Sequence, residues 1–251
     1  MTQIEASYID HMGSDLSVVN AARVSFGKKS EWDFECDCVA DWSCIMAGGC
    51  DCGEPQNARQ LSKRDTKLIN YLAKHKHISP FGHAFVSFHC QAPIFVARQL
   101  VKHKFLRWNE ISRRYVDDEP EFYMPDTWRG RSADKKQGSE GAVDVSGFTF
   151  QFATIGKNTI PDAESRFNNH ALEFYEDLLE HGVAPEQARM VLPQSTMTEW
   201  IWSGSLDAFA DMCRLRCKED TQYESRLVAK DISKKMAELF PASWSALMIN
   251  S

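Results

Sequence analysis

Residues 93–115 read PIFVARQLVKHKFLRWNEISRRY, an apolar run followed directly by a cationic one. Pro93 suits the first turn of a helix, and the apolar residues behind it predict a helix through about His103. From Lys102 to Tyr115 the chain carries five cationic side chains within fourteen residues. A globular protein seldom places so many cations beside a buried element unless they face an anion. The stretch therefore predicts an anion site, and phosphate is the obvious ligand.

The charge of the whole chain is opposite in sign to that of this stretch. Its 251 residues include 29 Lys and Arg against 35 Asp and Glu, a net charge of −6 at pH 7. This balance argues against nonspecific nucleic-acid binding, which usually requires a basic domain. No apolar run approaches the length of a membrane span, and no basic-then-apolar signal begins the sequence. We expect a cytoplasmic protein (host cytoplasm, if viral) without a nucleic-acid or membrane partner.

A cysteine-rich insert at about 31–57 breaks the pattern of the rest. It contains several glycines and lacks periodicity, which is typical of a loop between two ordered elements. Thiolates are preferred zinc ligands, so the insert can hold a structural metal ion. The spacing is not that of a C-x-x-C knuckle, and reduced surface thiols are the simpler explanation. We predict no metal site, with one alternative ligand set: Cys36, Cys38, Cys44, Cys50 and Cys52.

The hydrophobic pattern predicts an α+β fold in which a small antiparallel or mixed sheet accompanies long helices. Alternating apolar residues predict a strand at 83–91, and residues 198–202 also have strand character. Residues 130–147 are polar and rich in glycine, which predicts a mobile surface loop. We expect a single domain over residues 1–251, because the chain can bury one sizeable core and shows no internal repeat.

Helical spacing and capping signals account for most of the remaining residues. Ser62 and Asp65 predict a capped helix, and Thr221 and Glu224 predict a capping box for the last long helix. The other predicted helices span 15–23, 162–181, 185–192 and 205–216.

Arginines in the second half of the chain are candidates for binding the same anion. Arg214 and Arg216 end one predicted helix, and Arg189 follows a shorter one. An arginine near a helix C-terminus can simply complement the helix dipole, and for Arg214 this explanation and a binding role stay equally open. A planar guanidinium can also bind a phosphate, or the paired carbonyl oxygens of a pyrimidine, through two parallel hydrogen bonds. We expect that role of Arg189 and Arg216.

Several blocks of the sequence resemble the flavin-dependent thymidylate synthases. Their signature R-H-R-x-x-S-x-N-E-x-S-x-R is similar to residues 102–114. Other segments in family order are NAARVSF at 20–26, HISPFGH at 77–83, APIFVARQ at 92–99 and ARMVLP at 188–193. The resemblance covers most of the chain except the cysteine-rich insert and the 130–147 loop.

The resemblance implies an α+β subunit in a homotetramer, with each active site assembled from several chains. The implied reaction methylates C5 of dUMP with methylenetetrahydrofolate, while FAD carries reducing equivalents from NADPH. Its products are dTMP and tetrahydrofolate. Redox chemistry then belongs to the flavin, and the protein binds, orients and polarises the reactants.

For the flavin, the resemblance implies contacts from Lys102, His103 and Lys104, whose cations suit the FAD pyrophosphate. His103 can stack on the flavin or donate a hydrogen bond to it; a solvated basic helix end is the alternative. Glu110 matches a residue that contacts both flavin and nucleotide, and a simple ion pair with a nearby arginine is its alternative. The remaining implied FAD contacts are Ser25, His77, Ser79, Ser205 and Asp211.

For the nucleotide, Ser112, Arg113 and Arg114 match the loop that holds the dUMP phosphate. Arg216 matches an arginine that faces the uracil, where it would stabilise charge near N3 and make C5 more nucleophilic. We therefore predict Arg216 as the catalytic residue. Ser112 has no evident paired base, which argues against a serine nucleophile. The other implied dUMP contacts are Gln99, Lys102, Glu110 and Arg189.

The sequence departs from the family pattern in two places. Lys102 and Lys104 replace signature arginines, and Arg107 replaces the signature serine. Lysine binds as a point charge, so phosphate attraction should survive while flavin orientation is in question. The family's N-x-R and following Asn correspond to residues 205–207 and Asp211. The acidic side chains of Asp207 and Asp211 would contact ribose hydroxyls, adenine or solvent more readily than a phosphate.

Two other hypotheses compete with this reaction. A thymidylate synthase with a cysteine nucleophile is disfavoured, because Cys90, Cys213 and Cys217 lie in apolar or helical contexts. A zinc-dependent nucleic-acid-binding module would use the cysteine-rich insert and the basic segment. A flavoenzyme is yellow when purified, whereas the zinc module is colourless and zinc-loaded.

Overall fold

The computed structural model describes residues 3–34, 59–116, 118–132, 139–145, 150–152, 156–158 and 160–249. Internal contacts divide the chain into two compact units. The first unit comprises Met1–Asp10, Ser87–Gly204 and Asp211–Lys235, and the second comprises His11–Val86, Ser205–Ala210 and Met236–Ser251. The single domain expected over residues 1–251 stays a prediction.

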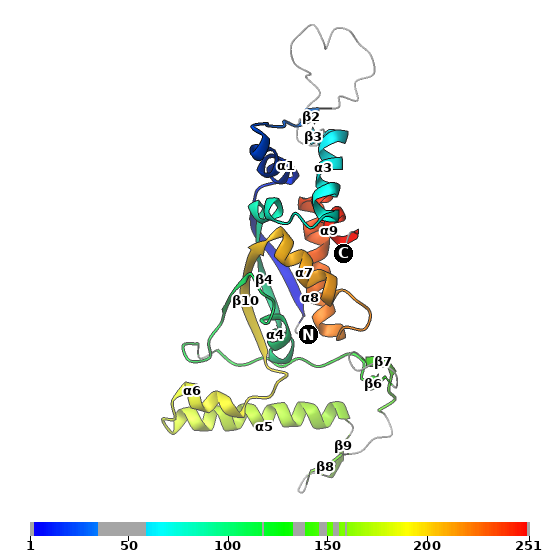
Figure 1. Ribbon diagram of the computed structural model, residues 1–251. Coiled ribbons are helices and arrows are strands. Elements are labelled where there is room, and N and C mark those ends of the chain that lie inside the picture. Colours follow the sequence, from blue (N-terminus) through cyan, green and yellow to red (C-terminus); the bar gives the residue numbers. More distant parts are fainter. Residues whose placement is uncertain are drawn as a thin grey trace, which may run out of the picture. The chain divides into compact units, whose positions relative to one another are not determined.

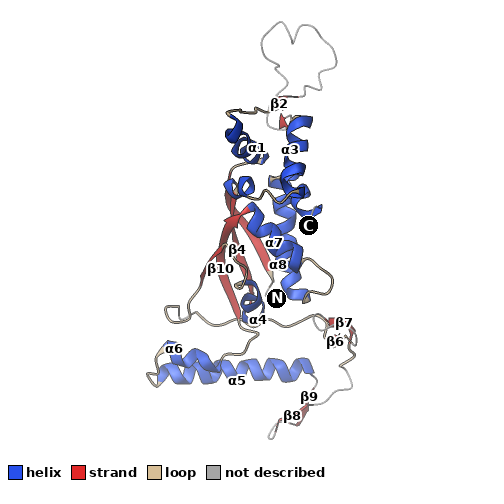
Figure 2. Ribbon diagram, viewed as in Figure 1, coloured by secondary structure: helices blue, strands red, loops and turns tan. Residues whose placement is uncertain are grey.

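A four-stranded sheet lies, for most of its length, in the first unit (Figures 1 and 2). Its strand order is β1-β4-β10-β5. The strands are β1 (Glu5–Met12), β4 (Phe85–Pro93), β10 (Met197–Ser205) and β5 (Leu106–Glu110). Together with the long helices described below, this sheet confirms the α+β class.

Two of these strands were predicted and two were not. In β4, Val86, Phe88 and Cys90 are fully buried, which confirms the alternating pattern on which the prediction rested. β5 pairs antiparallel with β10 at the edge of the sheet, where Trp202 faces Trp108. An edge strand can carry charged side chains on its solvent side, so the cationic segment that contains β5 gave no strand signal.

The helix after β4 is shorter than predicted. α4 spans Ile94–Leu100, and Pro93 is the last residue of β4 as well as the N-cap of α4. The prediction that this helix continues to His103 is wrong. His103 N–H donates to Leu100 O in a turn, and Phe105 has a φ of 65°, which an α-helix does not accommodate. The cationic stretch therefore lies on a turn, the edge strand β5 and a second turn after it.

The long helix predicted at 162–181 is confirmed as α5 (Ile160–Glu180). Gly182 ends it with a φ of 81°, and its N–H donates to Leu179 O. This left-handed conformation is the usual glycine stop at a helix C-terminus. The other helical elements with residues in the first unit are α6 (Pro185–Ala188), the 3₁₀ turn η3 (Arg189–Val191), α7 (Leu206–Arg216) and α8 (Tyr223–Leu239).

The predicted capping box of α8 is wrong. Thr221 Oγ1 donates to Leu215 O at 2.9 Å. The Glu224 carboxylate is buried and accepts from Arg129 and, at 3.4 Å, from the Tyr123 hydroxyl. A buried carboxylate needs strong partners, and an arginine supplies more than the local backbone amide of a cap.

Short antiparallel strand pairs occur at both predicted loops. β6 (Arg129–Arg131) pairs with β7 (Ser139–Ala142) inside the segment predicted as a mobile loop, so that prediction is wrong for these residues. β2 (Asp33–Phe34) pairs with β3 (Arg59–Gln60) around the cysteine-rich insert. The remaining hairpin joins β8 (Phe150–Phe152) to β9 (Gly156–Asn158). The five cysteines of the insert lie outside the described residues.

Helices dominate the second unit (Figure 1). α1 (Asp15–Arg23) and α3 (Lys63–Lys74) confirm two predicted helices, and Ser62 Oγ accepts the Asp65 N–H at 3.0 Å as predicted for the cap of α3. The 3₁₀ turns η1 (Val24–Phe26) and η2 (Ser79–His83) and the helix α9 (Pro241–Ile249) complete its described elements.

Helix α9 was not predicted, because its sequence lacks the alternation of apolar and polar faces that indicates a helix. It packs against α3 and α1. Asp15 caps it from a distance: its carboxylate is 3% exposed and accepts the N–H groups of Ala242 and Ser243, each at 2.9 Å. Among the helices of the described ranges, none is long and apolar enough to cross a membrane.

Candidate functional site

Arg216 lies at the C-terminal end of α7, half-buried against α4 and the turn that follows it. Its Nε donates to His103 Nε2 at 3.0 Å, and its Nη2 donates to Gln99 O at 3.2 Å. Three residues that the sequence singled out separately are therefore in direct contact within the first unit. A cation beside the last carbonyls of α4 is also favoured by the helix dipole.

His103 is a hydrogen-bond acceptor in this arrangement. Burial, and then the positive charge of Arg216, lowers the pKa of His103 to about 4. The imidazole is therefore neutral at pH 7, with Nε2 accepting from Arg216 and the proton on Nδ1. Burial also lowers the pKa of Arg216, but a guanidinium stays charged at neutral pH. His103 thus orients Arg216 and keeps one N–H available for a ligand.

The side chain of Gln99 is held by the first turns of α8. Its Nε2 donates to Gln222 Oε1, and its Oε1 accepts from Ser225 Oγ at 3.3 Å. In the sequence, Gln222 stands at a helix start, where capping is the simpler interpretation, and Ser225 carries no signal of its own. Only their position, one helical turn apart at the start of α8, could have indicated that they face the same neighbour.

Next to this cluster, the first unit contains a cavity of about 390 Å³ that sequence reasoning missed. Its aromatic lining includes Phe95, Tyr123 and Trp128. Oε2 of Glu164 and Oε2 of Glu224 are buried without a hydrogen-bond partner in the described part of the chain. Burial, and then the charge of Glu224, raises the pKa of Tyr123 to about 12, and burial raises the pKa of Glu164. The cavity is lined by buried carboxylates and a protonated phenol, and the cation of its lining, Arg129, is paired with Glu224.

In the segment predicted to hold the dUMP phosphate, Arg113 and Arg114 have different surroundings. Ser112 Oγ accepts from the backbone N–H and from Nε of Arg114, both at 3.4 Å, and the Arg114 guanidinium lies 4.9 Å from the centre of the Tyr115 ring. Arg114 is exposed, so most of its donors face solvent. Arg113 instead donates to Asp118 O, which closes its own loop.

Glu110 and Arg189 have local partners. Glu110 Oε1 accepts from Thr198 Oγ1 at 2.7 Å and Oε2 from Trp108 Nε1 at 3.0 Å, so the alternative of an ion pair with an arginine is not the arrangement seen. Arg189 lies exposed in η3, and its Nε donates to Glu186 O at 3.3 Å. Lys102 and Lys104 are also exposed.

Three of the predicted flavin contacts line one pocket of the second unit. Ser25, His77 and Ser79 border a pocket of about 870 Å³. Its cationic lining consists of Arg23, Lys28, Arg64 and Lys67. These cations suit a pyrophosphate, and Tyr71, which stacks near His77 with 6.1 Å between ring centres, provides a flat surface for a heterocycle. The residues present therefore fit FAD.

Arg64, Lys67 and Tyr71 were missed by sequence reasoning. They occur at spacings of three and four on α3, so they share one helical face. That spacing was visible in the sequence, but a solvated helix face explains it equally well until the pocket is seen.

The other predicted contacts are less clearly placed. Ser205 ends β10. Asp211 forms an ion pair with Arg214, three residues further along α7, so the structure favours a structural role for Arg214. In the part of the chain that the structure describes, no three His, Cys, Asp or Glu side chains group as metal ligands.

The cysteines outside the insert do not present an exposed thiolate. Burial raises the pKa of Cys90 and of Cys213. A hydrogen bond with Cys213 lowers the pKa of Cys217, but Cys217 is half-buried on the same helix end. These environments argue against the cysteine-based mechanism.

The neutral state of His103 predicts a pH dependence of stability. The unfolded chain protonates this residue near pH 6.5, whereas the folded protein resists protonation until about pH 4. The contribution of His103 to the free energy of unfolding is therefore fully present above pH 6.5 and is lost as the pH falls towards 4. We expect the loss to be on the order of 2 kcal/mol in urea unfolding. The variant His103→Gln should show a correspondingly smaller decline, and equal declines in both proteins would contradict the assignment.

Known proteins resemble this chain in both sequence and structure. The family model of thymidylate synthase complementing protein matches residues 7–242. A flavin-dependent thymidylate synthase of Thermus thermophilus is 33% identical over 238 residues, which cover 95% of this chain and 73% of that protein. The Thermosipho africanus enzyme of the same name is 31% identical over 240 residues, covering 96% of this chain and 89% of that protein.

Solved structures agree with these relatives. The structure of PolB, a UMP/dUMP methylase from Streptomyces cacaoi bound with 5-Br dUMP, has a TM-score of 0.72 and 28% identity, covering 98% of this chain and 94% of that one. Its structure with 5-Br UMP has a TM-score of 0.74 and 26% identity, covering 100% and 96%. The chain therefore belongs to the thymidylate synthase complementing protein family, the family of the flavin-dependent thymidylate synthases.

Proposed function

We propose that this protein converts dUMP to dTMP, with methylenetetrahydrofolate as the one-carbon donor and FAD passing reducing equivalents from NADPH. The observation that carries the proposal is the contact between Arg216 of α7 and a neutral His103, which lies in the segment that resembles the family signature. Family membership supports a flavin enzyme, and the likeness to a UMP/dUMP methylase supports a uridine nucleotide as substrate.

In this proposal Arg216 acts on the pyrimidine ring. Two of its five N–H groups are used on His103 and Gln99, which leaves donors for the carbonyl and N3 region of uracil. A guanidinium there stabilises negative charge on the ring and makes C5 a better nucleophile. Ser112 and Arg114 hold the phosphate, and Gln99 and Glu110 hold the nucleoside. Arg113, directed to Asp118, keeps the phosphate loop closed.

FAD, when bound, supplies the hydride chemistry. We place its pyrophosphate against the cations of the pocket that contains Ser25, His77 and Ser79. Lys102, His103 and Lys104 of the first unit stay the flavin contacts that the resemblance implies: the two lysines are exposed, and His103 keeps one N–H that does not bond to Arg216. Ser205 and Asp211 are the weaker members of the set, because Asp211 is already paired with Arg214.

We also propose that the protein acts as a homotetramer in which several chains contribute to each active site. Arg189 supports this view. It is exposed, and within the described ranges its side chain has the local contact with Glu186 O, as expected of a phosphate ligand for a neighbouring subunit.

The reaction is tested by release of tritium from C5-tritiated dUMP by the purified protein. Methylation replaces the hydrogen at C5, so we expect release that requires methylenetetrahydrofolate, FAD and NADPH together, from a protein that is yellow. Omitting NADPH is the control for the reductant, and C5-tritiated UMP tests whether the ribose form is also accepted. A colourless protein, or release that is independent of FAD, would contradict the proposal.

A further inference from the structure

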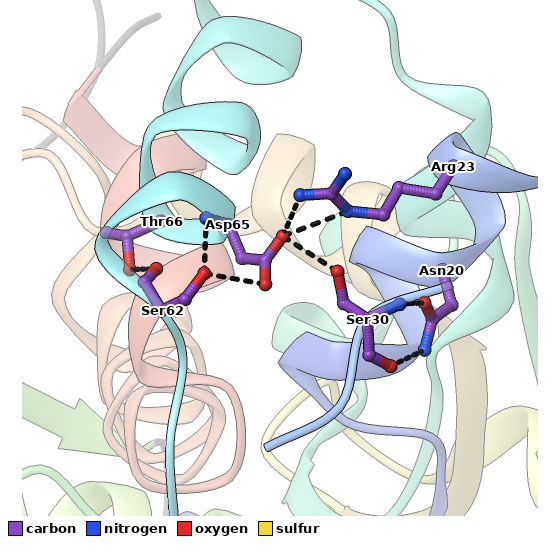
Figure 3. A network of polar contacts seen from close by, with 6 residues as sticks. All are labelled: Asn20, Arg23, Ser30, Ser62, Asp65 and Thr66. Atoms are coloured by element: carbon purple, nitrogen blue, oxygen red, sulfur yellow. Dashed lines mark hydrogen bonds and ion pairs between the residues drawn. The ribbon is translucent and has the colours of Figure 1, made fainter. Parts of the chain in front are cut away.

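Asp65 is a buried carboxylate in the second unit, with 3% of its surface exposed (Figure 3). Its Oδ1 accepts from Nε and Nη2 of Arg23 and, at 3.0 Å, from Ser30 Oγ. Its Oδ2 accepts from Ser62 Oγ at 2.8 Å. Burial by itself raises the pKa of Asp65, but the hydrogen bonds from Arg23, Ser62 and Ser30 and the charge of Arg23 lower it more, so its net pKa lies below the usual range. The group is ionised at neutral pH.

Through Arg23 and Ser30, this carboxylate closes the base of a loop. Residues 24–29 lie between them, and the loop turns at Gly27, whose φ is 61°. Asn20 secures the far end: its Oδ1 accepts the Ser30 N–H at 2.7 Å, and its Nδ2 donates to Ser30 O at 3.0 Å. The loop is therefore fixed at both ends. Within it, the N–H groups of Gly27 and Lys28 donate to Val24 O and Arg23 O, and the Phe26 side chain at its tip is 78% exposed.

Through Ser62 and its own backbone, Asp65 belongs to the first turn of α3. Ser62 Oγ accepts the Asp65 N–H at 3.0 Å while donating to the Asp65 carboxylate. A carboxylate at this position also interacts favourably with the positive end of the helix dipole. Asp65 therefore joins α3 to the 24–29 loop, and Figure 3 shows the connection running from Thr66 to Asn20.

The two elements that Asp65 joins are two walls of the 870 Å³ pocket. The loop contributes Ser25, Phe26 and Lys28, and α3 contributes side chains that include Arg64 and Lys67. Asp65 itself does not line the pocket. Its effect on a ligand would therefore be indirect, through the spacing of the two walls and the orientation of Arg23.

We propose that Asp65 is a positioning residue for the cofactor, because it holds the Ser25 loop and the cationic face of α3 at the spacing that a dinucleotide requires. This inference rests on the proposed function, in which the pocket binds FAD. Asp65, Ser30 and Asn20 would then affect FAD binding although none of them lines the pocket.

The test is FAD affinity of the full-length variant Asp65→Asn, which keeps the size of the side chain but removes its charge. The neutral Asn side chain accepts weaker hydrogen bonds from the Arg23 guanidinium and from the hydroxyls of Ser30 and Ser62. We therefore expect the Kd for FAD to rise about tenfold. The FAD concentration at half-maximal activity should rise equally, while kcat at saturating FAD stays near that of the wild type. Both are measured at physiological salt, so that the newly unpaired charge of Arg23 is partly screened.

Asp15→Asn is the matched control. Asp15 is equally buried in the same unit and also caps a helix, but it contacts neither the loop nor the pocket. It should lower the melting temperature without changing the Kd for FAD. If both variants lose FAD to the same degree, the effect is general destabilisation and the positioning role is wrong.

A second variant keeps the test decisive if Asp65→Asn does not fold. Ser30→Ala removes one donor to Asp65 and leaves every pocket-lining residue in place. It should raise the Kd for FAD about threefold. An unchanged Kd in a folded variant would overturn the inference and leave the proposed function intact. A wild-type protein that binds no FAD would instead overturn the proposed function.

Discussion

Replacing Arg216 with alanine is expected to lower kcat for dTMP formation by about 10²–10³-fold, the loss typical of removing one donor to a developing charge. The guanidinium is fixed by His103 at 3.0 Å and by Gln99 O at 3.2 Å, so its remaining donors need no reorganisation during the reaction. The FAD absorbance of the variant should be retained, because the pocket proposed for the flavin is built from other residues.

Two variants of the same helix serve as controls for this prediction. Arg214→Ala removes an arginine two residues away that is paired with Asp211, and it should keep most of the activity. Arg216→Lys keeps the charge but loses the planar fork, and should have intermediate activity. Tritium release from C5-tritiated dUMP measures all three. Near-normal kcat in Arg216→Ala, with the protein folded and yellow, would refute the catalytic role.

Replacing Trp202 with alanine is expected to lower the free energy of unfolding by about 3–5 kcal/mol, as large-to-small substitutions of buried aromatic residues do. Trp202 is 1% exposed on β10. Its ring packs at 78° to Trp108 and at 70° to Trp200, with ring centres 5.6 Å and 6.4 Å apart. It also lies 6.5 Å from the His103 ring, so the substitution removes part of the support for the acceptor of Arg216.

This second prediction therefore has two readouts, urea unfolding and kcat. Trp202→Phe keeps an aromatic ring and should recover much of both. Trp108→Ala removes a partner that is only half-buried on the edge strand β5, and should lower stability less than Trp202→Ala. An equal loss of stability in Trp108→Ala and Trp202→Ala would contradict the assignment of Trp202 to the core. Full kcat in Trp202→Ala would show that this ring does not support His103.

Elements with a clear local period were predictable. The buried residues of β4 alternate along a single strand, and the helices α1, α3 and α5 repeat apolar residues on one face. Such a period needs no knowledge of the partner that covers it. The blocks that resemble the family were likewise continuous in sequence, and the comparisons confirm that resemblance.

Elements whose pattern depends on a distant partner were not predictable. β5 was not predicted, because only its pairing with β10 makes it a strand. The capping box at Thr221 and Glu224 satisfied the local rule, yet Arg129 lies near enough to take the carboxylate. α9 had no polar face, and its cap comes from Asp15, 227 residues away.

The amino-acid sequence by itself determined the family, the local helices and strands, and the concentration of cations around the signature, because each is written in neighbouring residues. Only the tertiary structure decided how those residues work together. His103 became a neutral acceptor because Arg216, 113 residues away, is packed against it in a partly buried place where a second positive charge is unfavourable. Asp65 joins two pocket walls because folding brings Arg23, 42 residues away, to its carboxylate, and a buried charge is stable only when such a partner satisfies it.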